Sequence, residues 1–260
     1  MKAFQPADHL HSRTFLSLLV AQFLAAFNDQ AIHASAMFFA INTQTMTEAG
    51  AISLMPILFY APWAIFCTIA GYFADRYSKR VSLITWKFVE VAITLLALAG
   101  FWIGRHGEPT LGAWIVLATV FLMGMHSAFF VPAKYGAMPE ILTPRMLSKG
   151  NGVLESLSFL AVILGTVAGG VLSTLFLRHE FMIGIILTAL AVVGALSSLF
   201  IEKIPAANTF RPFPPFIYQP LIQNIRALLS SRPLIFAVVG IAFFTFLVSF
   251  MRAVVYMHGH

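Results

Sequence analysis

The chain has 260 residues, of which 59% are hydrophobic and only 10% are charged. A soluble domain carries roughly 25% charged residues, so this composition excludes an ordinary soluble protein. The formal charge is +6, but the basic residues stand at the ends of apolar runs rather than in one cluster, which disfavours nucleic acid as a partner. We therefore predict an all-α integral membrane protein that crosses the bilayer several times.

Seven apolar runs are long enough to cross a membrane as helices. They cover residues 14–41, 51–74, 81–103, 111–135, 150–177, 181–201 and 233–256. Lys2 and Arg13 precede the first run as in a signal peptide, but the run is too long for one and contains polar residues at its centre. We expect a retained first span. The single cysteine, Cys67, excludes an internal disulfide.

Asn28, Asp29 and Gln30 lie near the middle of the first span. An ionised Asp at the bilayer centre costs about 2.5–3.5 kcal/mol on insertion scales, so its presence needs a physical reason. Helical spacing places Gln22, Asp29 and His33 on one face. This face is either a polar patch that fixes helix packing or the wall of a water-filled cavity where Asp29 holds a substrate cation or a coupling ion. We favour the cavity.

The connection between the second and third spans reads GYFADRYSKR. It resembles the signature loop of the major facilitator superfamily, Gly-x-x-x-Asp-Arg-x-Gly-Arg-Lys/Arg, with Ser78 in place of the second glycine. We expect the glycine to permit close helix approach and the final basic pair to anchor the loop in the cytoplasm. The resemblance implies that the loop acid locks two transporter halves together; the alternative is an ordinary basic turn. The matching residues are Gly71, Asp75, Arg76, Lys79 and Arg80.

Other charged residues favour structure rather than catalysis. Lys87 and Glu90 stand one helical turn apart in the third span and are predicted to neutralise each other. The string RHEFMI begins like a zinc-binding helix, but Ile183 occupies the position of the second His. The sequence also lacks a Gly-rich phosphate loop with Lys. We predict no enzyme activity, no cofactor and no metal site.

Three strings resemble the lysophospholipid transporter branch of the same superfamily: AQFLAAFNDQA, FVPAKYGAMPEIL and KGNGVLESLSFLAVILGTVAGGVL. Within them, Pro-Ala-Lys-Tyr-Gly is the most specific signal. The departures are Gln30 in place of Asn and Lys149-Gly150 in place of Lys-Ala, and neither changes the charge. The matching residues are Asp29, Lys134, Tyr135, Gly136, Asn151, Gly152, Glu155, Gly165, Gly169 and Gly170.

The resemblance implies a site for a zwitterionic head group, in which Asp29 meets the cation and the cations of the fourth and seventh spans meet the anion. Lys134 is alternatively an anchor that reaches outward, and Arg252 is alternatively a flanking residue. Residues 28–30 would form the polar floor of the cavity. The candidate substrate-binding residues are Asn28, Asp29, Gln30, His33, Lys134, Glu155 and Arg252.

The fifth span contains Gly165-x-x-x-Gly169-Gly170, a spacing that allows tight helix packing. It is similar to the antiporter motif of the superfamily but has Thr166 where that motif has proline. This difference disfavours a drug antiporter.

The spans divide into one six-span half (1–201), a linker (202–232) and a seventh span (233–260) that begins a second half. The linker is rich in proline, and its apolar residues recur at helical spacing, which predicts a short helix on the membrane surface. A seven-helix receptor or rhodopsin-like protein would have the same number of spans. The seventh span of this chain, however, contains no Lys that could form a Schiff base with retinal, which disfavours that class. Alternating access needs two halves that move against each other, so we expect this chain alone not to transport. The residues of the predicted surface helix are Ile217, Leu221, Ile225, Leu228 and Leu229.

The distribution of Lys and Arg predicts a cytoplasmic N-terminus, because basic residues concentrate on the inner side of membrane proteins. Arg105 and Arg178 alone fall in the opposite connections. The predicted inner side holds Lys2, Arg13, Arg76, Lys79, Arg80, Lys134, Arg145, Lys149, Lys203, Arg211, Arg226 and Arg232.

The residues and the resemblance together predict a transporter in a bacterial inner membrane that moves lysophospholipids from the outer to the inner leaflet. The expected partners are membrane lipids, the lysophospholipid and an acyltransferase or acyl-activating enzyme that restores the second chain. Two alternatives stay open. One is a superfamily transporter of a drug or another small organic solute, and the other is a truncated membrane protein that does not transport.

Overall fold

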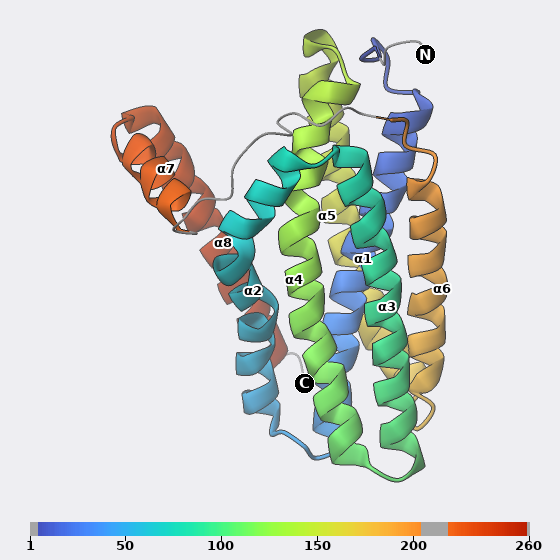
Figure 1. Ribbon diagram of the computed structural model, residues 1–260. Coiled ribbons are helices and arrows are strands. Elements are labelled where there is room, and N and C mark those ends of the chain that lie inside the picture. The colour runs from blue at the N-terminus through green and yellow to red at the C-terminus, as the bar shows by residue number, and fades with distance from the viewer. Residues whose placement is uncertain (1–4, 204–217, 259–260) are drawn as a thin grey trace. The chain divides into compact units, whose positions relative to one another are not determined.

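The computed structural model of the protein describes residues 5–203 and 218–258 (Figure 1). All regular elements in these ranges are helices, apart from one isolated bridge between Ala7 and Leu142. The predicted all-α architecture is confirmed. The helices are α1 (Arg13–Asn42), α2 (Glu48–Arg76), α3 (Lys79–His106), α4 (Pro109–Ile141), α5 (Pro144–Leu175), α6 (Phe181–Ser198), α7 (Gln219–Leu229) and α8 (Arg232–His258).

The chain divides into two compact units, Met1–Arg211 and Pro212–His260. In the first unit, α1 to α6 are each long and apolar enough to cross a membrane. The predicted spans are therefore confirmed there, with two larger differences in extent. α4 continues to Ile141 instead of ending near residue 135, with Pro139 accommodated inside the helix, and α5 begins at Pro144 instead of near residue 150. The protein is a multi-pass membrane protein.

The second unit contains α7 and α8, which meet at a bend of 109° between Leu221–Leu229 and Arg232–Val248. Taken together, the two helices are long and apolar enough to form a seventh span. α7 covers the stretch where a short helix was predicted from apolar spacing, although Ile217 falls outside the described residues. Its position on the membrane surface stays a prediction.

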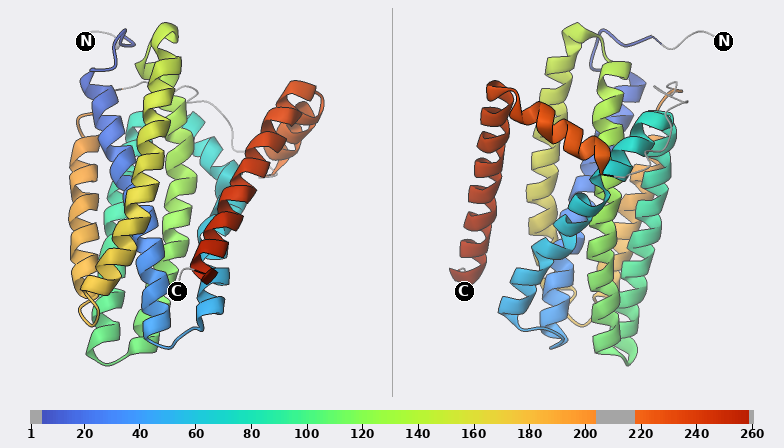
Figure 2. Two further views of the ribbon diagram at one scale, coloured as in Figure 1. Left: turned by 180° about the vertical axis from the view of Figure 1, so that it is seen from behind. Right: turned by 60° about the vertical axis from the view of Figure 1, so that its left-hand side comes forward.

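The first unit is built around α1, which contacts all five other helices of that unit (Figures 1 and 2). Its most extensive packing is against α5 and α6, while α3 packs against α4 and α6, and α2 packs against α4. Because α1 is enclosed in this way, its polar side chains are buried inside the bundle rather than exposed to lipid.

Glycines allow the helix backbones of the first unit to approach closely. A Cβ added at Gly169 of α5 would lie 2.6 Å from the carbonyl oxygen of Ala31 in α1. A Cβ at Gly184 of α6 would lie 2.6 Å from Cα of Leu98 in α3. Small residues at such contacts permit the van der Waals packing that holds membrane helices together. The tight packing predicted for the fifth span is confirmed at Gly169.

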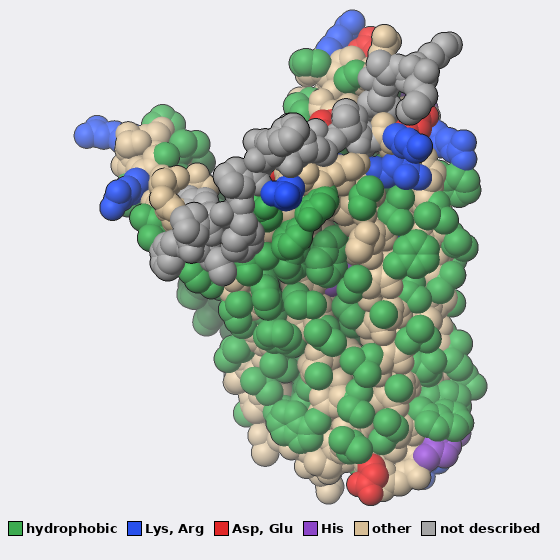
Figure 3. Space-filling view, in the orientation of Figure 1, with side chains coloured by type: hydrophobic (Ala, Val, Ile, Leu, Met, Phe, Trp, Pro, Cys, Tyr) green, Lys and Arg blue, Asp and Glu red, His purple; other side chains and the backbone are tan. Residues whose placement is uncertain are grey.

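Most Lys and Arg side chains of the first unit gather at one end. The antiparallel helices bring the start of α1, α3 and α5 to the same end as the close of α2, α4 and α6. Lys and Arg side chains cluster at this end in Figure 3, whereas the body below it is covered by hydrophobic side chains. We call this the basic end of the bundle, and the other the distal end.

Replacement of two neighbouring glycines tests the α1–α5 contact. We expect Gly169→Ala to destabilise the protein by about 1–3 kcal/mol because the new methyl group overlaps the α1 backbone. Gly170→Ala is the matched control, since its Cβ would meet only Phe38 Cε2 at 3.8 Å. Thermal unfolding of the purified protein in detergent measures both. Equal melting temperatures would contradict the close contact.

Candidate functional site

A cavity of about 370 Å³ lies within the first unit, between α1, α2, α4 and α5. Its aromatic wall comes from α2, through Phe59, Tyr60 and Trp63. Its polar wall comes mainly from α1 and α4. The polar lining residues are Gln22, Asp29, Gln30, Ser127, Lys134, Tyr135 and Ser158.

Asp29 presents one unsatisfied carboxylate oxygen in this cavity. The side chain is only 8% exposed. Its Oδ2 accepts a hydrogen bond of 2.5 Å from Ser127 Oγ, whereas Oδ1 has no hydrogen-bond partner among the described residues. A buried acceptor without a partner is costly, so this oxygen is suited to receive a donor from a bound molecule.

Lys134 supplies a positive charge to the same cavity. It is 3% exposed, and its Nζ lies 4.3 Å from the centroid of the Tyr135 ring. None of the ion pairs found among the described residues includes it. Tyr135 is held in place because its hydroxyl donates a hydrogen bond to Glu155 Oε1. A nearly buried ammonium without a carboxylate partner can pair with an anion that enters the cavity.

Two further contacts shape the cavity wall. Gln22 Nε2 donates a hydrogen bond of 2.9 Å to Ser158 Oγ, which joins α1 to α5. Trp63 Nε1 is buried and has no hydrogen-bond partner within the described part of the chain. The cavity therefore offers an unpaired donor as well as an unpaired acceptor.

The polar triplet of the first span is divided by the structure. Asp29 and Gln30 line the cavity, but Asn28 is completely buried on the opposite side of α1. Asn28 Nδ2 donates to Glu90 Oε1 at 2.9 Å and to the Leu187 carbonyl oxygen at 3.3 Å. The single polar floor expected from these three residues is not formed, because consecutive helical residues point about 100° apart.

The other predicted site residues lie at different distances from the cavity. His33 does not line it; its ring packs edge-to-face against Phe59, with centroids 6.0 Å apart. Glu155 does not line the cavity, but it accepts a hydrogen bond from Tyr135, which does. Arg252 falls within α8, but its side chain lies outside the described residues.

Lys87 and Glu90 form the buried pair predicted from their spacing. Lys87 Nζ lies 2.5 Å from Glu90 Oε2, and both side chains are fully buried. His126 of α4 is also fully buried, and its Nε2 lies 3.7 Å from the same carboxylate oxygen. Together with Asn28, these residues tie α1, α3 and α4 together. Sequence spacing indicated the pair but not His126, which lies on another helix.

Breaking this pair should destabilise the protein strongly. We expect Lys87→Met to cost about 3–5 kcal/mol, because it leaves the Glu90 carboxylate buried and uncompensated. The double variant Lys87→Met/Glu90→Gln should recover much of this loss, since no unpaired charge then remains. Thermal unfolding in detergent measures both, with Lys149→Met at the helix surface as the control. A double variant no more stable than Lys87→Met would show that the charge pairing is not the cause.

The signature-like loop is more buried than expected. Lys79 was predicted to anchor the loop in the cytoplasm, but it is 3% exposed and donates a hydrogen bond to the Ala74 carbonyl oxygen. Its Nζ lies 4.0 Å from Glu140 Oε1, and its stem covers Gly136 of α4. The missing side chain at Gly136 leaves room for the lysine against α4, so Lys79 lies against the bundle, and the cytoplasmic placement of the loop stays a prediction.

The remaining loop residues differ in their contacts and exposure. Arg80 Nε donates a hydrogen bond of 2.6 Å to the Ile201 carbonyl oxygen beyond the end of α6, and Arg76 Nη1 donates one of 2.8 Å to the Tyr72 hydroxyl. Asp75 is exposed. A Cβ at Gly71 would meet no atom within 4 Å, so the close approach expected there is absent from the described structure.

Ser127 and Trp63 belong to the cavity but were not singled out from the sequence. Ser127 precedes Lys134 by seven residues on α4, so helical spacing places both on one face. Trp63 follows Phe59 by four residues and shares its face of α2. The signal was therefore present in both cases. No group of three or more His, Cys, Asp or Glu that could hold a metal ion occurs among the described residues.

Comparison with known proteins identifies relatives of this chain. The sequence profile described as Major Facilitator Superfamily matches residues 18–260. The lysophospholipid transporter LplT of Yersinia enterocolitica is 30% identical over 200 residues, which cover 77% of this chain and 45% of that protein. LplT of Cronobacter sakazakii is 30% identical over 246 residues, covering 92% of this chain and 56% of the relative. The chain thus spans about half the length of these curated relatives.

Proposed function

This chain belongs to the Major Facilitator Superfamily, and we propose that it provides the first six spans and the start of the second half of a lysophospholipid transporter. The transporter would carry lysophospholipids from the outer to the inner leaflet of a bacterial inner membrane. An acyltransferase or acyl-activating enzyme would then use the delivered lipid. The similarity to lysophospholipid transporters of Yersinia and Cronobacter supports the substrate class.

The observation that carries this proposal is the presence of two buried side chains of opposite charge in one cavity, neither of which forms an ion pair with a described residue. Asp29 Oδ1 lacks a partner, and the Lys134 ammonium pairs with no described carboxylate. A zwitterionic head group carries an ammonium and a phosphate, so each of its charges meets an opposite one. The aromatic residues of α2 offer an apolar wall for the rest of the lipid.

The cavity volume also fits a head group. Ligand pockets commonly measure about 300–1,000 Å³, and this cavity of about 370 Å³ lies near the lower end of that range. It is suited to a compact polar group rather than to a complete lipid. The acyl chain would then extend from the cavity along apolar surface.

A transporter of a cationic drug or organic solute is the second candidate, because Asp29 alone would suit a cation. Lys134 disfavours this, since a cation entering the cavity would meet a second, unpaired positive charge. A protein that does not transport is the third candidate. It would leave unexplained why Asp29 and Lys134 are kept unpaired where burial is costly.

Matched head groups test which charge meets which residue. We expect Asp29→Asn to weaken binding of lysophosphatidylethanolamine about tenfold or more, because the ammonium loses its carboxylate. Binding of lysophosphatidylglycerol, whose head group has no cation, should change much less. Lys134→Gln should weaken both lipids, since both contain the phosphate. Titration of fluorescent lipids onto the protein in nanodiscs measures these affinities.

Asp8→Asn is the control for this experiment, because Asp8 interacts with Thr143 near the start of α5 and does not line the cavity. The transport claim is tested by introducing Asp29→Asn into the source cells' own gene and measuring uptake of labelled lysophosphatidylethanolamine by spheroplasts. Uptake should be lost with normal expression. Unchanged uptake would return Asp29 to a packing role.

The orientation of the bundle is a further part of the proposal. The concentration of Lys and Arg at the basic end supports a cytoplasmic N-terminus. A reporter fused after Arg80 should therefore be active only in its cytoplasmic form, and one inserted near Glu108 only in its periplasmic form. Paired phosphatase and fluorescent-protein fusions measure this. The reversed pattern would invert the assigned direction of transport.

A further inference from the structure

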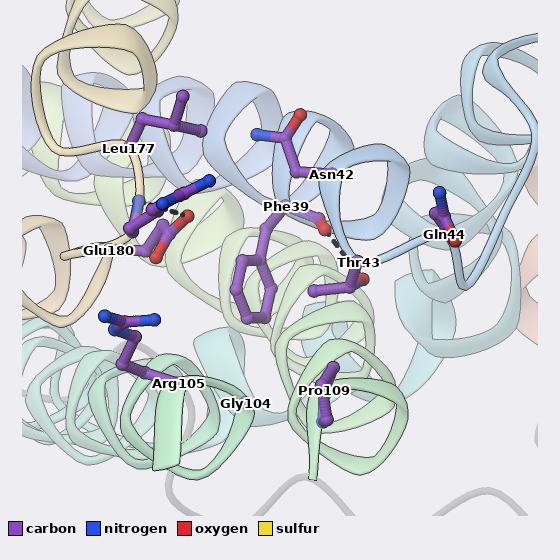
Figure 4. Close-up of a pocket in the computed structure, with 10 residues that line it drawn as sticks. Phe39, Asn42, Thr43, Gln44, Gly104, Arg105, Pro109, Leu177 and Glu180 are labelled. Atoms are coloured by element: carbon purple, nitrogen blue, oxygen red, sulfur yellow. Dashed lines mark hydrogen bonds between the residues drawn. The ribbon is translucent and has the colours of Figure 1, made fainter. Parts of the chain in front are cut away.

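A second cavity, of about 440 Å³, lies at the distal end of the first unit. It is formed where α1 and α3 end, where α4 begins, and by the connection between α5 and α6. Figure 4 shows Arg105 from α3 and Glu180 from the α5–α6 connection pointing toward the same space beside Phe39. Arg178 of that connection also lines the cavity.

Two arginines that are distant in sequence meet at this cavity. Arg105 and Arg178 are the only Lys or Arg residues in the distal segments 42–48, 103–109 and 175–181. Basic residues are normally depleted on the side opposite the basic loops. That both exceptions line one cavity indicates a shared role rather than two separate anchors.

Neither guanidinium group is used by the fold. No hydrogen bond from either side chain and no ion pair is found among the described residues. Glu180 is the carboxylate of the cavity, and it is 7% exposed. Its Oε1 accepts a hydrogen bond of 3.0 Å from the backbone N–H of Arg178 rather than from a guanidinium. The two cations and one anion leave the cavity with a net positive charge.

The backbone at Arg178 is held in an uncommon conformation. Its φ is +70°, in the left-handed region that non-glycine residues rarely adopt. The Glu180 hydrogen bond and the bond of 2.7 Å from His179 N–H to the Phe176 carbonyl oxygen hold this turn. Strain of this kind concentrates at ligand sites, where the surroundings fix a side chain that would otherwise point elsewhere.

Two of the four tryptophans mark the distal end as a membrane interface. Trp102 and Trp114 are 50% and 52% exposed and lie close in sequence to Arg105 and Pro109 of the cavity. Tryptophan is enriched at the level of the lipid head groups. The two tryptophans therefore favour a position of the cavity near the phosphate groups of the facing leaflet.

We propose that the Arg105–Arg178 cavity is a second phosphate-binding site, which captures the phosphodiester of a lysophospholipid from the facing leaflet before the head group enters the Asp29 cavity. Guanidinium groups bind phosphate with two parallel hydrogen bonds, which suits a singly charged phosphodiester. The role in capture depends on the proposed function, whereas the site itself depends only on the distal geometry.

A local probe separates this site from the central one. Leu177→Cys, with the natural Cys67 changed to Ser, carries an environment-sensitive dye at the cavity edge. The labelled protein is placed in nanodiscs, and its dye fluorescence is measured during titration with lysophosphatidylethanolamine and, separately, with inorganic phosphate. We expect the fluorescence change to saturate with the lipid, and the affinity for the lipid to fall about tenfold or more in Arg105→Gln/Arg178→Gln. The control pair Arg145→Gln/Lys149→Gln removes equal charge at the basic end and should leave the affinity unchanged.

Uptake measurements separate a failure of the distal site from a failure of the proposed transport function. In spheroplasts, Arg105→Gln/Arg178→Gln should raise the uptake KM about tenfold with the maximal rate retained, because it weakens capture alone. An unchanged dye response and KM, while Asp29→Asn abolishes uptake, would overturn the distal site only. Saturation by inorganic phosphate at the same concentration as the lipid would overturn the lipid assignment. A normal distal response with uptake unaffected by Asp29→Asn would instead contradict the proposed function.

Discussion

The rotation of α1 about its own axis is the constraint on which the first unit depends. Asn28 and Asp29 are neighbours, yet one hydrogen-bonds Glu90 in α3 and the other faces the cavity. The close approach of Gly169 to Ala31 fixes α1 against α5, and Asn28 fixes it on the α3 and α6 side. A small rotation would bury Asp29 without Ser127 and remove a donor from Glu90.

Buried charges in this unit fall into two groups with different consequences. Lys87 and Glu90 neutralise each other, and Lys79 lies near Glu140, so these charges stabilise the contacts between helices. Asp29 and Lys134 are also buried and line one cavity, but neither forms an ion pair with a described residue, and Asp29 Oδ1 has no hydrogen-bond partner among them. Because an uncompensated charge inside a membrane is costly, its retention is best explained by a ligand that compensates it.

Hydropathy predicted the six spans of this unit. A helix that crosses the lipid bilayer must be long and apolar, and this requirement does not depend on how the helices pack against one another. Helical offsets brought Gln22 and Asp29 to one face, and the Pro-Ala-Lys-Tyr-Gly string selected Lys134. The opposite direction of Asn28 and the burial of Lys79 were not predictable, since both depend on partners from other helices. The meeting of Arg105 and Arg178 likewise depends on the spatial order of α3, α5 and α6, which no local pattern specifies.

A structure of the protein with lysophosphatidylethanolamine bound would show whether Asp29 and Lys134 hold the head group. We expect the ammonium at hydrogen-bond distance from Asp29 Oδ1, about 2.7–2.9 Å, with the phosphate beside Lys134 Nζ and the aromatic wall of α2 along the glycerol. A head group bound elsewhere, with Asp29 and Lys134 left without a ligand, would contradict this expectation.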